Sequence, residues 1–453
     1  MSQHTDAPDP ARLQSIADEL VALARKGGAD AAEAAVIESR STEVSLRDGE
    51  LEDIERSESQ DAGLRVMIGK RQAGVSFSDL SPDGLKTVVE RAIAMARIAP
   101  EDKWAGLAEP GQLCEHAPEI AMFEDGDWSP EHLEALAAEA EKAGRAVDGV
   151  TMTESSTASR GTATGAVAAS NGFAGSWRKS TMGYGAVMIA ARDGAMERDY
   201  AFTQARREAD LRSAEEIGKE AGERTVARLG PKTLPSGKRP VVFDRRVSSV
   251  FLSSLCGAIS GPAVARGVSF LRDKRGQKVF ADGIRILDVP TRDWGLGSRP
   301  WDGEGLPARD WAVIEDGVLT DWFLNLPAAR QLGLEPNGCA ARNLGGPPGA
   351  GPSNLHLDAG DSSPEDMIGG IADGLLVTDM FGPSLNPNTG DWSVGVSGFR
   401  IAGGAVDHPV SEITVAGNLV DIFARLVPAN DLLFRHAVNA PSVLVDDLSV
   451  GGS

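Results

Sequence analysis

Cysteine is scarce in this sequence. The 453 residues include 3 cysteines, Cys114, Cys256 and Cys339, which lie far apart along the chain. An odd number of widely spaced cysteines argues against a disulfide framework and fits a reducing compartment. No CxxC pair occurs, so zinc and redox motifs built on that pair are excluded.

Basic residues are also in short supply. Lys and Arg total 45 against 66 Asp and Glu, which gives a formal net charge of −21. Affinity for a phosphate backbone comes mainly from Lys and Arg side chains that release counterions. The sequence has no long run of basic residues and no zinc-finger or RNP-type motif. We therefore expect no direct binding to nucleic acid.

Long apolar runs are missing as well. No stretch of about 18 successive apolar residues occurs, so no membrane span is expected. The first residues, MSQHTDAPDPARLQS, lack a basic start followed by an apolar segment, and we expect no signal peptide. An apolar fraction of 42% and a charged fraction of 25% are typical of globular proteins. These features predict a cytoplasmic protein.

Helical and strand-like patterns divide the chain into three parts. Residues 1–105 are predicted to form a helix–strands–helix domain. A linker rich in Pro, Gly and acidic residues follows, and a second domain at 120–230 combines a helix that opens at Ser129 with a β-meander. The third domain, 238–453, holds many short strands. The predicted fold class is α+β, with two N-terminal α+β domains and a C-terminal domain rich in antiparallel β-sheet.

Local turn signals place several connections. Two strand-like runs are expected at 34–41 and 43–50, and Asp48-Gly49, near the end of the second run, is a typical hairpin turn that leads to residues 51–55. The Gly- and Pro-rich stretch LGGPPGAGPS at 344–353 is expected to be a mobile loop.

The stretch 386–418, NPNTGDWSVGVSGFRIAGGAVDHPVSEITVAGN, is patterned like a binding site but holds few groups that do chemistry. Turn formers open it, and a strand-like run follows with Val394 and Val396 on one face. Phe399 resumes the apolar face out of register, which predicts a bulge near Gly398. Such a strand presents backbone and glycine to a group that must approach closely.

This stretch resembles the C-terminal signature of the TldD/PmbA family, in particular its PmbA (TldE) branch. Three other parts are similar to the family: GLRVMIGKRQAGVSFSDLSPDGL at 63–85, GAD at 28–30 and APSVLVDDLSVGG at 440–452. The resemblance covers nearly the whole chain. It implies a cytoplasmic heteromeric zinc metallopeptidase that acts on unfolded or modified peptides, including precursors of ribosomally made peptide antibiotics. Family members have also been called modulators of DNA gyrase.

The zinc-binding pattern of TldD-like relatives is missing from this chain. The resemblance implies an HExxxH element on the first helix of the C-terminal domain, with both His on one metal and the Glu as base. The sequence SGPAVARGVSF at 260–270 resembles the region after that element. Counting back places Leu252 and Gly257 at the two His positions and Ser253 at the Glu position. We expect no catalytic residue and no zinc in this chain, and zinc in a TldD-like partner.

Histidine is too rare to rebuild that element nearby. The chain has 6 histidines, and none lies between His132 and His356, so a shift of the alignment changes nothing. His356 with Asp358, and Asp407 with His408, are His/carboxylate pairs that a metal could use. The favoured interpretation of both pairs is solvent-facing polar positions near turns.

Two other residue types leave alternatives open. Cys256 lies on an apolar helix face, which favours a small core residue over a reactive thiol. Trp294 and Trp301 lie in the turn-rich stretch TRDWGLGSRPWDGEG. Core packing is favoured for them, and the alternative is a surface for a partner or a peptide.

The leading hypothesis is a non-catalytic partner subunit of a TldD/TldE-type zinc metallopeptidase. An unfolded peptide would add as a strand to residues 391–401, with Asp391, Ser393, Gly395 and Gly398 near the shared cleft. One alternative is a peptide- or gyrase-associated binding protein without peptidase activity, homodimeric in isolation. The other is a metallopeptidase with an unrelated metal site at one of the two His/carboxylate pairs.

Overall fold

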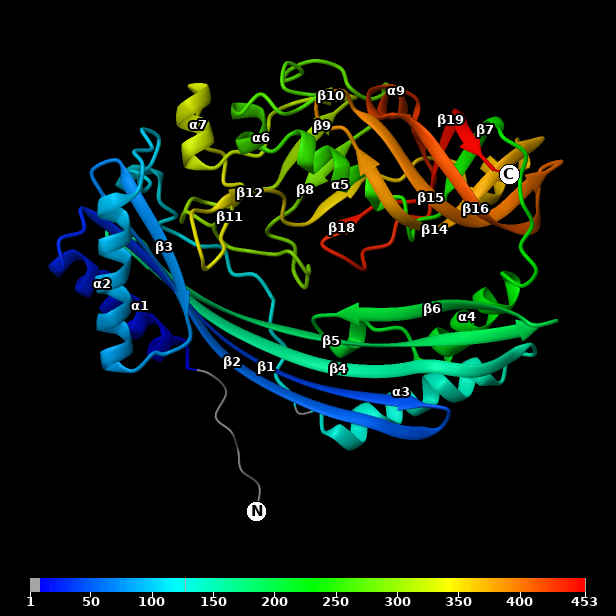
Figure 1. Ribbon diagram of the computed structural model, residues 1–453, viewed down its shortest axis with the longest axis horizontal. Helices are drawn as coiled ribbons and strands as arrows, with labels where there is room; N and C mark the ends of the chain where they lie inside the picture. The colour runs from blue at the N-terminus through cyan, green and yellow to red at the C-terminus, as the bar shows by residue number, and fades with distance from the viewer. Residues whose placement is uncertain (1–8, 127, 453) are drawn as a thin grey trace.

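The computed structural model describes residues 9–126 and 128–452. His4 and most of the N-terminal stretch on which the expectation of no signal peptide rests lie outside the described residues. Figure 1 shows a long curved sheet beneath a C-terminal half built from shorter strands and helices. Within the described ranges, no helix is long and apolar enough to cross a membrane.

One antiparallel sheet runs through the N-terminal half in the order β3-β2-β1-β4-β5-β6. Its strands are β1 (Ala31–Arg47), β2 (Glu50–Ile68), β3 (Arg71–Phe77), β4 (Val150–Ala169), β5 (Ala174–Arg192) and β6 (Ala195–Ala205). The predicted turn at Asp48-Gly49 joins β1 to β2. The two strands expected at 34–41 and 43–50 are one continuous strand, because β2 and β4 supply hydrogen bonds along both of its edges. The first two predicted domains therefore share a sheet.

Four helices lie against one face of this sheet. They are α1 (Pro10–Lys26), α2 (Pro82–Ile98), α3 (Pro130–Arg145) and α4 (Ala214–Ala227), and short 3₁₀ turns occur at Pro110–Gln112 and Glu208–Asp210. On β1, Ala34 and Val36 pack under α1 and α2, whereas Val44 packs under α3 and α4. Ala35 points to the other face and packs with Trp301. Strand alternation thus separates the helical layer from the C-terminal half.

The C-terminal half is built around a nearly closed sheet. Its strands are β7 (Gly237–Phe243), β14 (Asp373–Leu385), β15 (Asp391–Ala402), β16 (Ala405–Asn418), β17 (Val427–Pro428) and β19 (Val443–Gly451). The order is β16-β15-β14-β7-β19-β17, and β16 also pairs with β19, which closes the ring. β14 and β7 are parallel and the other neighbours are antiparallel. The predicted α+β class, with a C-terminal part rich in antiparallel sheet, is confirmed.

Smaller elements surround this sheet. A second sheet has the order β10-β9-β8-β13-β18. Its strands are β8 (Ile286–Asp288), β9 (Trp311–Glu315), β10 (Val318–Leu319), β13 (Leu355–Leu357) and β18 (Val438–Asn439), and β11 (Ala340–Ala341) pairs with β12 (Gly349–Ala350). The helices are α5 (Ser249–Ala258), α6 (Gly261–Ala265), α7 (Leu326–Leu332), α8 (Pro364–Gly369) and α9 (Leu419–Arg425). The main core forms between the two sheets and α5, with Phe243, Phe323 and Phe423 fully buried.

The loop 344–353, which we expected to be mobile, packs against the N-terminal sheet. A Cβ atom added at Gly63 of β2 would lie 2.2 Å from the Leu344 carbonyl oxygen, and one at Gly74 of β3 would lie 2.9 Å from the Gly345 oxygen. Glycine at these two positions allows the loop backbone to lie directly on the strands. The two halves of the chain are in close contact here.

Candidate functional site

Strand β15, the predicted peptide-binding strand, has no free edge. It pairs with β14 on one side and with β16 on the other. Its backbone donors and acceptors are therefore used within the sheet, and an extended peptide cannot add to it. The prediction of strand addition at residues 391–401 is wrong. Its sequence pattern shows a strand, and the strands that pair with it, β14 and β16, are the ones directly before and after it in the chain.

The glycines of β15 make room for the protein's own chain. A Cβ atom at Gly398 would lie 1.9 Å from the Leu376 carbonyl oxygen of β14, and one at Gly395 would lie 2.4 Å from the Phe381 ring. The predicted close approach is therefore made by β14. The register shifts near Gly398 are present as predicted, on both sides of β15. Glu412 on β16 has φ of 58° at the shift.

Asp391 closes the turn at the start of β15. Its carboxylate accepts hydrogen bonds from Thr389 Oγ1 at 2.7 Å and from Asn418 Nδ2 at 3.0 Å. These bonds, that of Thr389 first, hold the pKa of Asp391 below its usual value. Ser393 is partly exposed on the face of β15 that alternates with the core residue Val394. Whether Asp391, Ser393, Gly395 and Gly398 lie near a partner or peptide stays a prediction.

Helix α5 carries the positions that the resemblance assigns to the zinc element. Leu252 is 2% exposed and belongs to the main core, whereas Ser253 and Gly257 are exposed. At 3.6 residues per turn, positions 252 and 257 point about 140° apart around the helix. Ser253 Oγ donates to the Ser249 carbonyl oxygen at 3.1 Å. Leucine and glycine offer no ligand atom, so the residues present do not fit a zinc ion.

His356 is a buried residue, which corrects the interpretation as a solvent-facing position. It lies on β13 with 5% of its surface exposed, and its ring stands edge-on to Phe434 with centroids 5.0 Å apart. Nε2 is 3.3 Å from Asp358 Oδ1. Burial first, and then the nearby Arg292, lower the pKa of His356, so the imidazole is neutral near pH 7.

The second His/carboxylate pair lies on β16. His408 Nδ1 is 2.9 Å from Asp407 Oδ2, and the Asp407 side chain is largely exposed. Across residues 9–126 and 128–452, no group of three or more His, Cys, Asp and Glu is arranged to hold a metal ion. Each of the two pairs thus brings together two potential ligands without a third of these types beside them.

The cysteine and tryptophan positions serve mainly in packing. Cys256 packs against the main core, and burial raises the pKa of its thiol to about 12. A thiol with that pKa is protonated near pH 7 and is a poor nucleophile. Trp301 packs edge-to-face on Phe173 with centroids 5.6 Å apart. Trp294 is partly exposed with φ of 60°, and the Arg207 guanidinium lies 5.0 Å from its ring centroid.

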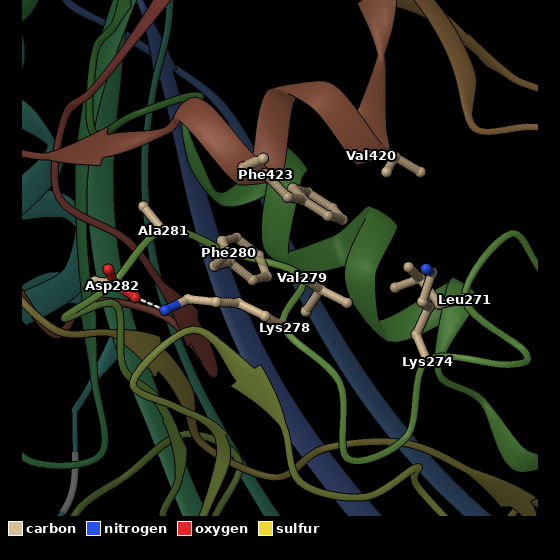
Figure 2. Close-up of a pocket in the computed structure, with 10 residues that line it drawn as sticks. Leu271, Lys274, Lys278, Val279, Phe280, Ala281, Asp282, Val420 and Phe423 are labelled. Atoms are coloured by element: carbon tan, nitrogen blue, oxygen red, sulfur yellow. Dashed lines mark ion pairs between the residues drawn. The ribbon is translucent and has the colours of Figure 1, made fainter.

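A cavity of about 460 Å³ lies between α9 and the segment 271–282. Figure 2 shows Phe280 and Phe423 beside each other in its wall, and their rings stack with centroids 4.6 Å apart. Lys278 pairs with Asp282 at the rim. The walls offer apolar packing and one ion pair rather than several polar groups directed at one point, so we assign no chemistry to this cavity.

A second cavity, of about 240 Å³, lies at the start of α5. Its lining includes four arginines, Arg224, Arg245, Arg246 and Arg435, which no sequence pattern had singled out. They come from separate segments and meet only in the folded chain. The adjacent pair Arg245-Arg246, just before a helix, was the one local signal available.

Comparison with known proteins assigns the chain to a family. Models of the PmbA/TldA metallopeptidase match three segments: domain 1 at residues 32–96, the central domain at 123–229 and the C-terminal domain at 236–452. The chain belongs to the PmbA/TldD family. It is 34% identical to Metalloprotease PmbA of Escherichia coli O157:H7 over 444 residues, which are 97% of each chain. It is 31% identical to the PmbA homolog of Haemophilus influenzae over 440 residues, 96% of this chain and 94% of that one.

Solved structures of PmbA/TldD-like proteins have the same fold. A proposed modulator of DNA gyrase from Bacteroides thetaiotaomicron superposes with a TM-score of 0.89 at 27% identity, over 97% of this chain and 99% of that one. TldE from Thermococcus kodakarensis superposes with a TM-score of 0.85 at 22% identity, over 96% and 100%, which shows the fold alone. The resemblance to the PmbA/TldD family is confirmed.

Proposed function

We propose that this chain is a non-catalytic subunit of a cytoplasmic TldD/TldE-type metallopeptidase, and that a TldD-like partner supplies zinc. The complex acts on unfolded or modified peptides, of the kind processed into peptide antibiotics. The observation that carries the proposal is that α5 lacks the residues of the zinc element. Leu252 points into the core where the resemblance expects a histidine, and Ser253 and Gly257 replace the other two residues of the element.

The fold supports a subunit that shapes a site rather than one that reacts. The chain matches all three family domains, at residues 32–96, 123–229 and 236–452, so the family architecture is kept although α5 lacks the ligand residues. Helix α5 keeps its place against the core through Phe251 and Leu255. A chain that retains the architecture and lacks the ligands fits a supporting role in a shared chamber. Because β15 is paired on both edges, strand addition at 391–401 is not part of the proposal.

The test combines the purified chain with a TldD-like chain that carries HExxxH. Alone, this protein should contain far less than one zinc per chain by atomic absorption and should leave unfolded casein uncleaved. Mixed with the partner, it should elute as one complex and cleavage should appear. A matched control replaces the glutamate of the partner's HExxxH with glutamine, which should remove cleavage and leave the complex intact. Stoichiometric zinc with cleavage by the isolated chain would contradict the proposal.

The two alternatives give different results in the same experiments. A peptide- or gyrase-associated binding protein would recover gyrase in a pull-down, would not join a TldD-like chain, and would remain a homodimer. A metallopeptidase with an unrelated metal site would lose its activity on His356→Ala or His408→Ala. Under the proposal, His408→Ala leaves the activity of the complex unchanged. His356→Ala removes a buried ring that packs on Phe434, so it lowers the stability of the chain without abolishing activity.

A further inference from the structure

Four guanidinium groups converge on the 240 Å³ cavity at the start of α5. Arg224 comes from α4, Arg245 and Arg246 precede α5, and Arg435 precedes β18. None of the lining residues is an Asp or a Glu. In a chain with a formal net charge of −21, this is a local reversal of sign. Such a reversal at a concave site favours an anionic ligand.

Carboxylates pair with three of the four arginines from outside the lining of the cavity. Arg246 pairs with Asp199 at 3.1 Å and with Asp244 at 3.5 Å, Arg245 pairs with Asp431 at 3.8 Å, and Arg224 pairs with Glu220. Asp199 is shared with Arg228, and Glu220 with Arg212. Within the part of the chain that the structure describes, the Arg435 side chain has no carboxylate within 4.0 Å, although Glu220 acts on it at longer range. None of these carboxylates lines the cavity, so the charged side chains on its surface are all arginines.

The arginines repel one another at close quarters. Burial, and then Arg246, lower the pKa of Arg224. Burial, and then Arg212 and Arg245, lower the pKa of Arg435. The side chains of Arg246 and Arg224 are only 15% and 21% exposed, so water screens this repulsion incompletely. A bound anion would relieve it and would gain charge-assisted hydrogen bonds.

Part of the cavity lining is apolar. Tyr200 and Phe202, from edge strand β6, are 44% and 40% exposed, and Leu433 is 40% exposed. The Phe202 ring lies 5.6 Å from that of His436, and burial and the adjacent Arg435 keep the pKa of His436 below its usual value. Ser249, the first residue of α5, also lines the cavity.

We propose that this cavity binds the C-terminal carboxylate of a peptide whose last side chain is apolar. The guanidinium groups take the carboxylate, and Tyr200 and Phe202 pack against the side chain. Inorganic phosphate shares the charge but cannot use the apolar wall. The inference rests on the proposed function in one respect, that the chain handles peptides. It adds which end of the peptide is recognised and where, in the turn of α5 that precedes Leu252.

Binding to the isolated full-length chain tests the inference directly. The probes are a hexapeptide that ends in Phe, as the free acid and as the C-terminal amide, and inorganic phosphate. By titration calorimetry at low salt, the free acid should bind about tenfold more tightly than the amide, the effect of one lost charged hydrogen bond. Arg435→Gln should reduce binding of the acid to the level of the amide. Arg272→Gln, an exposed arginine beside Asp273, makes the same charge change and should leave binding unaltered.

A second variant keeps the test decisive if Arg435→Gln unfolds. Phe202→Ala should weaken acid and amide alike, because it removes the apolar contact that both share. Equal affinity for acid and amide, or phosphate binding with no preference for the acid, would overturn the inference. The isolated chain suffices, so the result is independent of complex formation. Complex formation without peptide binding removes only this inference, and the acid preference without a complex removes only the proposed subunit role.

Discussion

Glu33 on β1 and Arg342 in the C-terminal half form a buried ion pair of 2.9 Å across 309 residues of chain. Arg65 Nε lies 2.6 Å from the other oxygen of the same carboxylate. Glu33 is 2% exposed, and the two arginines, Arg342 before Arg65, outweigh its burial and lower its pKa to about 2. One carboxylate thus holds two cationic groups from both halves of the molecule.

Replacing Glu33 by glutamine should be strongly destabilising. Glutamine keeps the volume but removes the negative charge that Arg65 and Arg342 share, which costs about 3 to 5 kcal/mol of unfolding free energy. Urea denaturation followed by circular dichroism measures this loss. The control is Glu52→Gln, which breaks the exposed pair with Arg47 and should cost less than about 1 kcal/mol. Equal effects of the two substitutions would show that the buried pair is unimportant.

Buried carboxyl groups should make stability depend on pH in two opposite ways. The pKa of Glu33 falls from 4.5 to about 2 on folding, so its contribution is present above pH 4.5 and is lost as the pH falls toward 2. Burial, and then Asp302, raise the pKa of Glu304 to about 8. The folded state therefore holds a proton that the unfolded state releases above pH 4.5, and stability falls as the pH rises from 4.5 to 8.

The alkaline part of this profile can be assigned by substitution. Glu304→Gln should flatten the fall in midpoint temperature between pH 5 and pH 9, because glutamine has no proton to lose. Glu90→Gln on the exposed face of α2 should leave the slope as it is in the unsubstituted chain. A slope that Glu304→Gln does not change would refute the assignment.

Two glycine-to-alanine substitutions should affect the free energy of unfolding differently. Gly398→Ala places a Cβ atom 1.9 Å from a strand backbone oxygen, and overpacking of this kind typically costs about 1 to 3 kcal/mol. Gly257→Ala on α5 meets nothing within 4 Å and should be neutral or stabilise by up to about 1 kcal/mol, since alanine favours helix. Midpoints of urea denaturation compare the two. A stable Gly398→Ala protein would mean that β14 and β15 can separate without cost.

Introducing the three residues of the zinc element into α5 should not create a zinc site. The triple variant Leu252→His, Ser253→Glu, Gly257→His places one histidine in the core and the other in solvent, on different sides of α5. We expect less than one zinc per chain by atomic absorption and a lower melting temperature, because a polar ring replaces a buried leucine. Stoichiometric zinc binding would show that α5 can rotate or shift.

Local signals in the sequence predicted local structure well. Ser129 caps the start of α3, where the sequence predicts that a helix opens, and its hydroxyl accepts a hydrogen bond from the His132 backbone N–H at 3.3 Å. The strand-like pattern of β15 does not by itself show that β14 and β16, its neighbours along the chain, pair with both of its edges. The burial of His356 could not be predicted either, because the Phe434 ring that packs on it lies 78 residues further along the chain.

The candidate site shows the same division. The loss of the zinc-ligand residues at positions 252, 253 and 257 could be predicted from the sequence alone, because leucine and glycine side chains have no ligand atom in any structure. The arginine cavity was not, since Arg224 and Arg435 are brought together only by the packing of α4 against the C-terminal half. Chemistry that depends on residue identity can be predicted from sequence, and chemistry that depends on convergence needs the fold.

Because β1 and β4 pair in one sheet, the first two family domains cannot be separated without breaking the hydrogen bonds between these strands. Cutting between residues 106 and 119 would separate β1 from β4 and uncover hydrogen-bonding edges on both, over Glu33–Leu46 and Ser156–Ala169. Exposed edges of that length promote aggregation. We expect neither fragment to remain monomeric by itself, so this part of the molecule should melt as one cooperative unit although family models divide it into two domains.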